Sequence, residues 1–537
     1  MKKFFLFLAS FYLCLATAFA QAPDIQWQNT IGGDTTDNLF SVQQTSDGGY
    51  ILGGSSISNI SGDKTENCLG NWDYWVIKID SIGNIQWQNT IGGNGDDELF
   101  SVQPTNDGGY ILGGGSGSNI SGDKTENIIG MWDYWIVKLD ASGNIQWQNT
   151  IGGTHYEQFS TIQQTFDGGY IIGGLSDSNI SGDKTENNIG GFGNYDYWIL
   201  KLDGLGNIQW QNTIGGIYTE WLTCLRQTTN GGYIIGGYSN SPASGDKTEN
   251  SIGSDDYWII KLDSLGNIQW QNTIGGNNSD KLNSIGQTTD GGYILGGSSQ
   301  SNISGDKTEN VVGNTIWGDY WVIKIDSSGN IQWQNTIGGN DNDYLWFVQQ
   351  TSEGGYVLGG NSGSNISGDK TEDNIGNYDF WIVKIDQSGN ILWQNTIGGT
   401  NHDIISSGTQ TLDAGFILSG WSRSNISGDK TENCLGAYDY WVIKLGPDTI
   451  TGVTNLKSPT SNFQIYPNPA DNELTITGLQ SPIQKIEILN LLGETVFSKE
   501  PQTLNFKLQT TFLPSGIYII KVYADEGVFQ QKLVINR

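Results

Sequence analysis

Two sets of carboxylates recur at fixed spacing, and they are the side chains best suited to bind a metal ion. One acid follows each Gly-Gly pair of a repeated WQNTIGG stretch, at Asp37, Asp97, Glu157, Glu220, Asp280, Asp343 and Asp403. The second set lies in a repeated SGDKTE sequence, at Asp63, Glu66, Asp123, Glu126, Asp183, Glu186, Asp246, Glu249, Asp306, Glu309, Asp369, Glu372, Asp429 and Glu432. Because Ca²⁺ binds six to eight oxygens, such a loop beside a neighbouring acid predicts a calcium site.

The same acids also have a structural interpretation. Asp and Glu side chains in turns often accept hydrogen bonds from backbone N–H groups, and the lysine inside SGDKTE offsets part of the loop's charge. We favour this capping role and keep calcium as the alternative, with no other cofactor expected.

Catalysis needs one differentiated set of acid, base or nucleophile, and near-identical copies leave few candidates for it. The only two histidines, His155 and His402, stand in two of the links that follow Gly-Gly pairs. The chain contains no HExxH, GxSxG or phosphate-loop motif. The sequence therefore favours a binding protein over an enzyme, and we assign no catalytic residue.

Two tryptophans and one lysine also recur in every copy. Trp27 and Trp75 are the first of each kind, and the large apolar area of such rings predicts packing between repeats rather than ligand stacking. The lysine interrupts an apolar strand, so we expect it to pair with a repeated carboxylate. These lysines are Lys78, Lys138, Lys201, Lys261, Lys324, Lys384 and Lys444.

Beyond the N-terminal segment the cysteines are Cys68, Cys224 and Cys434, an odd number that builds no disulfide framework. Cys68 and Cys434 occupy matching positions of the first and last repeats, so a disulfide would require these repeats to adjoin. We favour simple copying of the repeat, because a disulfide needs Cα atoms within about 7 Å and equivalent loops of adjacent repeats normally lie farther apart.

These residues belong to seven copies of one unit, marked by IQWQNTI or ILWQNTI. Each unit holds four short runs rich in β-branched and aromatic residues, which in the first copy begin at Leu39, Tyr50, Asp73 and Ile85. Asp-Gly-Gly and Ser-x-Gly-Asn turn sequences separate them. The pattern predicts an all-β fold built from four-stranded sheets.

The order of the runs predicts how the ends of the chain meet. The mature chain opens with an IQWQNTI strand at Ile25–Ile31, whereas the seventh copy, which ends near Lys444, lacks its fourth strand. We expect the first strand to complete the last sheet, because closing a ring in this way removes open sheet edges.

WQNTIGG, an acid four residues later and QQTSDGGYILGGSS resemble the repeats of secreted bacterial seven-bladed β-propellers. The resemblance covers about residues 25–446 and implies that residues 21–446 form a closed propeller with four strands per blade. It implies no single activity. The long SNISGDKTEN loops and the links between repeats then share one face, where variable loops on a rigid scaffold favour ligand binding.

Charge and targeting signals narrow the compartment. With 26 basic and 56 acidic residues the net charge is −30, which argues against nucleic acid as a partner. Residues 1–20 combine two lysines, an apolar run and Ala18-Phe19-Ala20, the pattern of a cleaved signal peptide. No later apolar run approaches 18 residues, so we expect no transmembrane segment in the mature chain.

A polar segment at residues 447–462 predicts a linker, after which a new strand pattern fills residues 463–537. The carrying residues are Tyr466-Pro467-Asn468-Pro469, Leu491-Leu492-Gly493, Ser515-Gly516-Ile517-Tyr518 and Lys532-Leu533-Val534-Ile535. They resemble the type IX secretion sorting domain of Bacteroidota-like bacteria. The resemblance implies a small Ig-like β-sandwich that engages the type IX machinery.

Together these features predict a secreted or outer-membrane surface protein whose acidic, loop-rich face binds an extracellular ligand. A glycan, an adhesin-type partner or an environmental polymer are the ligands we expect. A polysaccharide-degrading enzyme on the same scaffold and a purely structural surface protein are the alternatives.

Overall fold

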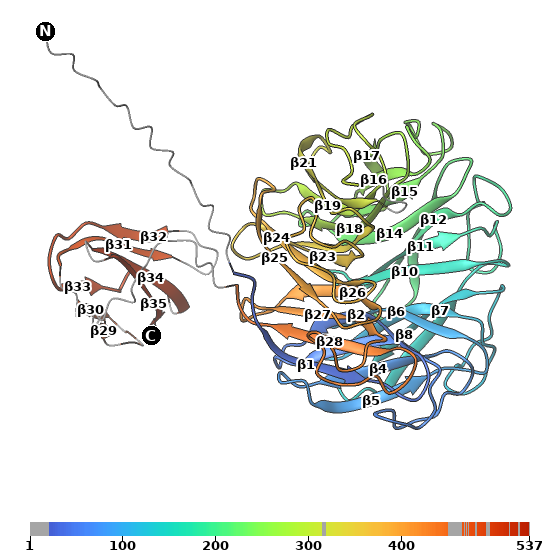
Figure 1. Ribbon diagram of the computed structural model, residues 1–537, viewed down its shortest axis with the longest axis horizontal. Coiled ribbons are helices and arrows are strands. Elements are labelled where there is room, and N and C mark those ends of the chain that lie inside the picture. Colours follow the sequence, from blue (N-terminus) through green and yellow to red (C-terminus); the bar gives the residue numbers. More distant parts are fainter. Residues whose placement is uncertain are drawn as a thin grey trace, which may run out of the picture. The chain divides into compact units, whose positions relative to one another are not determined.

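The computed structural model describes residues 21–313, 318–448, 464–466, 468, 470, 472–477, 481–489, 495–514, 516–524 and 527–535. The predicted signal peptide, most of the predicted linker, and Leu491-Leu492-Gly493 lie outside these residues. The chain divides into two compact units, Met1–Thr449 and Ile450–Arg537. Every regular element in the described part is a β-strand (Figure 1).

The first unit contains seven four-stranded antiparallel sheets, which we number 1 to 7 along the chain. The first strand of each sheet is β2 (Asp37–Gln44), β6 (Asp97–Pro104), β10 (Glu157–Gln164), β14 (Glu220–Gln227), β18 (Asp280–Gln287), β22 (Asp343–Gln350) and β26 (Asp403–Gln410). The second strands are β3 (Tyr50–Ser56), β7 (Tyr110–Ser116), β11 (Tyr170–Ser176), β15 (Tyr233–Ser239), β19 (Tyr293–Ser299), β23 (Tyr356–Ser362) and β27 (Phe416–Ser422).

The third strands are β4 (Asp73–Ile79), β8 (Asp133–Leu139), β12 (Asp196–Leu202), β16 (Asp256–Leu262), β20 (Asp319–Ile325), β24 (Asp379–Ile385) and β28 (Asp439–Leu445). The fourth strands of sheets 1 to 6 are β5 (Ile85–Ile91), β9 (Ile145–Ile151), β13 (Ile208–Ile214), β17 (Ile268–Ile274), β21 (Ile331–Ile337) and β25 (Ile391–Ile397). In sheet 7 the fourth place is taken by β1 (Ile25–Ile31), which pairs with β28.

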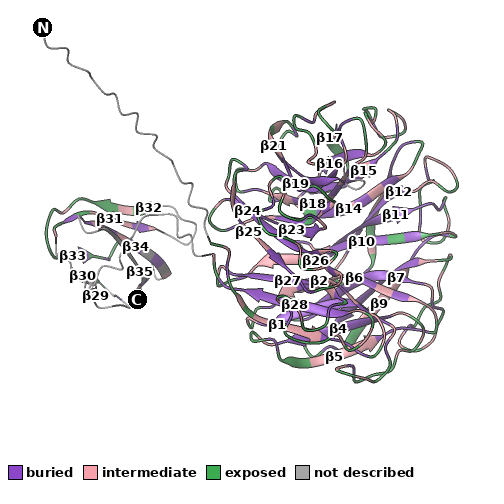
Figure 2. Ribbon diagram, in the orientation of Figure 1, coloured by how far each residue is buried: buried purple, intermediate pink, exposed green. Residues whose placement is uncertain are grey.

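The sheets are arranged like the blades of a propeller. In Figure 1 the first strands, such as β2, β6, β10 and β14, lie toward the middle of the unit, and fourth strands such as β1, β5 and β21 lie at its edge. The buried residues colour the middle of the sheets, while the connecting loops are exposed (Figure 2).

Each sheet packs on the next through a ring contact between the second residue of one third strand and the tryptophan of the next. At five of the seven junctions a tyrosine hydroxyl also donates to the tryptophan's carbonyl. Tyr74 Oη donates to the carbonyl of Trp135 at 3.0 Å, and the two rings lie 4.9 Å apart. The same contact joins sheet 7 to sheet 1, where Tyr440 Oη donates to the carbonyl of Trp75 at 3.1 Å. The seven apolar clusters of this unit each combine residues of two consecutive sheets.

Two adjacent glycines in the second strand make this packing possible. A Cβ on Gly54 would lie 2.5 Å from Tyr440 Oη, and one on Gly53 would lie 2.8 Å from the Val102 side chain. The missing side chains therefore let both neighbouring sheets approach the strand closely.

The second unit has two sheets that share a core. β29 (Gln464–Tyr466), β30 (Glu473–Thr477) and β33 (Phe506–Gln509) form one sheet. The other contains β31 (Ile483–Leu489), β32 (Thr495–Lys499), β34 (Gly516–Ala524) and β35 (Gly527–Ile535). Leu474 and Ile476 of the first sheet and Ile486 and Val522 of the second lie in one buried cluster.

Candidate functional site

The repeated lysines of the third strands are buried and pair with an acid of the Asp-Gly-Gly turn. Lys78 Nζ lies 3.0 Å from Asp47 Oδ2, and four other sheets repeat this ion pair. Lys261 is an exception because Asn230 replaces the aspartate, and it donates to the Leu262 carbonyl at 2.7 Å instead. These lysines link the third strand to a turn, so their role is structural.

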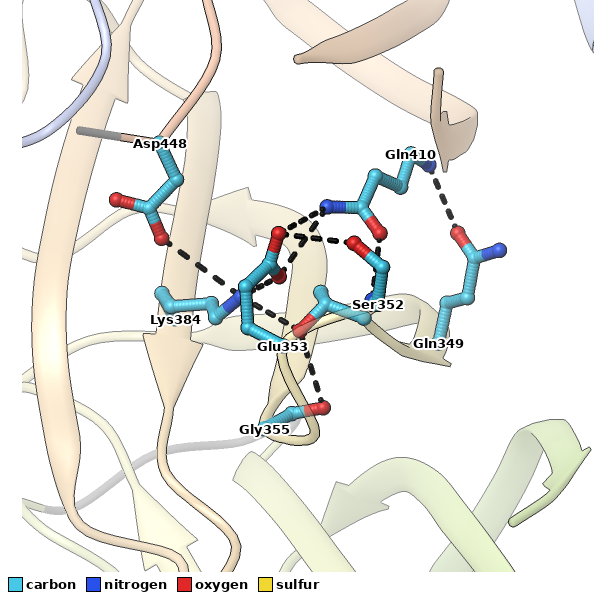
Figure 3. Close-up of polar contacts among 8 residues, drawn as sticks. Gln349, Ser352, Glu353, Gly355, Lys384, Gln410 and Asp448 are labelled. Carbon is cyan, nitrogen blue, oxygen red and sulfur yellow. Dashed lines mark hydrogen bonds and ion pairs between the residues drawn. The ribbon is translucent and has the colours of Figure 1, made fainter. Parts of the chain in front are cut away.

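In sheet 6 the third-strand lysine contacts two acids, one in the turn and one in the segment that follows sheet 7 (Figure 3). Lys384 Nζ lies 3.4 Å from Glu353 Oε2 and 3.7 Å from Asp448 Oδ2. The Asp448 side chain is 1% exposed. The start of the predicted linker is therefore held against sheet 6 by a buried charge pair.

Both repeated tryptophans pack between sheets. Trp75 is fully buried, and Trp27 is half-buried with its ring 5.9 Å from that of Tyr50 in the next sheet. The lysine of each SGDKTE loop completes this layer, with Lys64 Nζ 5.1 Å from the Trp75 ring centroid and bonded to Thr90 Oγ1. That packing of the loop lysine was not anticipated from sequence.

The SGDKTE acids accept backbone hydrogen bonds in all seven copies. Asp63 Oδ2 accepts from Gly32 N at 3.2 Å, and Glu66 Oε2 accepts from Thr90 N at 2.6 Å. The other copies repeat both bonds. In the described residues, no group of three or more His, Cys, Asp or Glu side chains is placed to hold a metal ion. Calcium stays a prediction that these contacts do not test.

The acids after the Gly-Gly pairs are buried, so they do not contribute to the acidic, loop-rich face that the sequence predicts. Asp37 is fully buried and accepts from Gly33 N at 2.7 Å and from Ser58 Oγ at 3.0 Å. A second buried aspartate, which begins each third strand, faces the corresponding acid of the next sheet, as Asp73 faces Asp97. Sequence reasoning missed this second set.

Burial raises the pKa of these third-strand aspartates, because the charged form loses its hydration. The pKa of Asp73 rises to about 6. That of Asp196 rises to about 8, where the nearby Glu220 adds to the effect of burial. Each junction between sheets therefore contains a buried third-strand aspartate whose pKa lies above its usual range.

The remaining singled-out residues have local contacts. Cys68 and Cys434 are free, and their thiols donate to the carbonyls of Ser56 and Ser422. His155 packs edge-on against Phe192 and His402 stacks on Tyr378. Nothing in these contacts joins the two histidines in one site.

Two of the positions that break the sevenfold copying lie on the first strands. The second residue of these strands is different in all seven sheets, whereas the fourth strand is IQWQNTI in six of them. The variable second residues are Asn38, Glu98, Gln158, Trp221, Lys281, Tyr344 and Ile404. The fourth residues also vary, and they are Phe40, Phe100, Ser160, Thr223, Asn283, Trp346 and Ser406.

A β-bulge determines which first-strand residues face the central channel, the space that the seven first strands surround. In β14 the pairing with β15 shifts between Leu222 and Cys224. Because a bulge shifts the alternation by one residue, Trp221, Thr223 and Arg226 are accessible while Leu222 and Leu225 are buried. The other first strands have the same shift.

One side of this channel contains a cleft of about 320 Å³ lined by sheets 3 to 6. Trp221 and Tyr238 stack with ring centroids 6.2 Å apart, and Trp346 is 41% exposed. Asn283 Nδ2 donates to the Leu345 carbonyl at 2.8 Å, which fixes the amide in the wall. We call these lining residues the aromatic cleft; the full lining is Gln158, Trp221, Thr223, Tyr238, Ser279, Lys281, Asn283, Ser298, Gln300, Tyr344 and Trp346.

The cleft combines flat apolar surfaces with hydrogen-bonding groups. Its lining includes no Asp or Glu, and its one cation, Lys281, lies 3.7 Å from Asp255 and 5.0 Å from the Tyr238 ring. Burial and the neighbouring Asp255 raise the pKa of Tyr238 to about 12, so its hydroxyl remains protonated at neutral pH. Such a surface suits a ligand with both apolar faces and hydroxyl groups.

A larger hollow of about 700 Å³ lies between residues 21–25 and sheet 6. Apart from those N-terminal residues, its lining consists of repeat residues such as Glu372, Trp393, Gln394 and Asp429. Because these residue types occur in the other sheets as well, the hollow offers no distinctive set of side chains that would select one ligand over another.

Comparison with known proteins identifies the second unit. Residues 464–536 match the family described as the secretion system C-terminal sorting domain. A segment of 74 residues is 35% identical to part of ulvan lyase NLR42 from Nonlabens ulvanivorans; it covers 13% of this chain and 14% of that protein. The chain thus matches only about a seventh of that relative's length.

The matches to solved structures have low identity and TM-scores below 0.5. Sqt1 from Chaetomium thermophilum has a TM-score of 0.39 at 10% identity and covers 78% of this chain and 100% of its own. PorZ, a surface component of the type IX secretion system of Porphyromonas gingivalis, has a TM-score of 0.30 at 11% identity and covers 96% and 75%.

The sorting domain establishes where the protein goes. It marks the chain for type IX secretion, and therefore for the cell surface or the medium. No helix within the described part of the chain has the length and apolar character needed to span a membrane.

Proposed function

We propose that the protein is an exported glycan-binding protein and that the aromatic cleft holds the sugar. The observation that supports this most is the concentration of non-copied residues around one hollow, since a purely structural repeat has no reason to vary there. Sugar rings present C–H faces and hydroxyl edges. Trp221, Trp346 and Tyr238 offer faces for the former, and Gln158 and Asn283 offer amides for the latter.

The cleft favours binding over hydrolysis. Glycoside hydrolysis generally uses two carboxyl groups that flank the scissile bond, and the lining of the cleft includes none. A polysaccharide-degrading enzyme on the same scaffold is the alternative, and product analysis of the binding mixture would reveal it.

The closed ring is part of the proposal. It is supported by the pairing of β1 with β28 and by the bond from Tyr440 to Trp75, which four of the other six junctions repeat. A closed ring would hold the seven first strands rigidly around the channel. We also propose an Ig-like sandwich for the second unit, supported by the core its two sheets share.

The test begins with a glycan screen of residues 21–446. Residues of the aromatic cleft are then substituted, and the affinity for the glycan that binds most tightly is measured again. Trp346→Ser and Trp221→Gln install residues that sheet 3 already has at these positions, Ser160 and Gln158, so the fold should tolerate them. We expect each to weaken binding at least about tenfold, or about 1.4 kcal/mol.

Phe166→Ala provides the matched control, because Phe166 is 71% exposed in the turn between β10 and β11. It should leave the affinity unchanged. Equal affinity of all three variants and the unmodified protein would contradict the proposed site.

A further inference from the structure

The central channel contains a second hollow at the opposite ends of the first strands. It measures about 580 Å³ and is lined by residues of sheets 1, 2, 4, 5, 6 and 7, among them Gln43, Gln103, Arg226 and Thr409. The first strands end here at the Asp-Gly-Gly turns, whereas the aromatic cleft lies nearer their beginnings.

Arg226 is the residue that distinguishes this hollow. It is one of only three arginines in the chain, and it occupies a position at which four other sheets have glutamine. Two of those glutamines brace the neighbouring strand: Gln163 Oε1 accepts from Gln227 N and Gln349 Oε1 accepts from Gln410 N, both at 2.8 Å. A guanidinium has no acceptor, so arginine in sheet 4 gives up that bracing role.

The guanidinium has space and no counter-charge. In sheet 5 the corresponding residue is Gly286, which places no side chain beside it. Arg226 Nη1 donates to the Leu225 carbonyl at 3.1 Å, and no described residue forms an ion pair with it. The side chain is exposed to the channel, while desolvation by the surrounding protein lowers its pKa without removing its charge at neutral pH.

The residues around Arg226 are neutral, in contrast to the strongly negative chain as a whole. The net charge is −30, yet the lining of this hollow includes no Asp or Glu. It does include side-chain amides that can donate hydrogen bonds, such as those of Gln43 and Gln103. A lone cation among neutral donors is suited to bind an oxyanion, which arginine can hold with two parallel hydrogen bonds.

We propose that Arg226 and the surrounding amides bind a carboxylate or sulfate group of an acidic glycan. Arg226 lies on the same strand as Trp221 and faces the same channel, about 16 Å along β14 at about 3.3 Å per residue. One extended oligosaccharide could therefore contact both hollows. The assignment of an acidic glycan as the ligand extends the proposed function and rests on it. The oxyanion site itself does not require the aromatic cleft.

The test compares acidic oligosaccharides with neutral counterparts of the same backbone, using isothermal titration of the whole mature chain, residues 21–537. Oligogalacturonate against its methyl ester tests the carboxylate, and a sulfated galactan oligomer against its desulfated form tests the sulfate. Arg226→Gln restores the residue of sheets 1, 2, 3 and 6, so it should fold. We expect it to weaken binding of the acidic form at least tenfold and leave binding of the neutral form unchanged.

Arg423→Gln removes the same charge from the loop after β27 and serves as the control for net charge. If neither acidic oligomer binds more tightly than its neutral form, or if Arg226→Gln and Arg423→Gln have equal effects, the oxyanion site is wrong. Failure of the proposed function looks different, because Trp346→Ser would then leave the binding of every oligomer unchanged.

Discussion

At the scale of single residues, the chain uses its repeated acids inside the structure. Asp196 and Glu220 face each other at the junction of sheets 3 and 4, and both are fully buried. In most third-strand aspartates the Oδ1 atom has no hydrogen-bond partner among the described residues, as in Asp73 and Asp319. A protonated pair satisfies such atoms better than two charges, so these junctions should be sensitive to pH.

The first prediction is that the propeller unit is more stable at pH 5 than at pH 8. The pKa of Asp196 is about 8 in the folded state against an ordinary value of 3.8. Between those values the folded state binds more protons than the unfolded state, so the free energy of unfolding falls as pH rises through the folded pKa. Asp196→Asn should remove at least about 1.4 kcal/mol of this dependence, the equivalent of one pKa unit.

Denaturant titrations of residues 21–446 at pH 5, 6, 7 and 8 would measure the effect. Asp34→Asn is the control, since Asp34 is an exposed acid in the link before β2. A stability that is the same at pH 5 and pH 8, or that rises toward pH 8, would show that the buried pairs do not hold protons.

The second prediction separates calcium from capping at the SGDKTE loops. Asp63 and Glu66 accept backbone N–H bonds, and Asn and Gln oxygens can accept the same bonds. Capping therefore predicts that Asp63→Asn with Glu66→Gln costs at most about 1 kcal/mol and that a chelator has no effect on the melting temperature. Calcium predicts a lower melting temperature with chelator. Thermal melts with EDTA and with added Ca²⁺ decide between them.

At the scale of elements, much of the fold can be read from the repeat. The predicted second, third and fourth runs begin at Tyr50, Asp73 and Ile85, and so do β3, β4 and β5. The first run begins two residues earlier than predicted because Asp37 already pairs with Ser56. Strand propensity and turn sequences carry this information locally.

The candidate site was harder to predict for a physical reason. The residues that all copies share include the repeated acids, so a search for shared residues finds those acids first. The cleft is lined by residues that differ between copies, such as Trp221 and Tyr344. Comparing the copies position by position would have revealed the variable positions. Which of them face the channel depends on the bulge after the third residue of each first strand, and no sequence pattern marks that bulge.

The third prediction concerns β1. Deletion of residues 21–31 removes the fourth strand of sheet 7 and the Ile31 contact with the cluster shared by sheets 7 and 1. We expect a lower melting temperature and self-association, because β28 would have an open edge. Light scattering and thermal melts measure both. A monomer that melts like residues 21–446 would show that the ring does not need this strand.

At the scale of the whole molecule, the two units divide the work. The second unit matches a sorting domain and has its own buried core, and the propeller unit contains the channel. Export and binding should therefore be separable.

The fourth prediction is that residues 463–537, fused to a reporter with a signal peptide, carry it to the surface or medium of a bacterium with type IX secretion. The chain without these residues should stay in the periplasm and still bind the same glycan. Cell fractionation and immunoblotting measure both. Surface delivery of the truncated chain would mean that another segment directs export.

The central claim is that the channel, and not the rim of repeated loops, binds the ligand. The most direct measurement is a crystal structure of residues 21–446 with an oligosaccharide selected by the glycan screen. We expect a sugar ring to pack against Trp221 or Trp346. If the ligand has an acidic group, we expect that group to bind Arg226. An oligosaccharide bound at the SGDKTE loops with the channel free of sugar would contradict it.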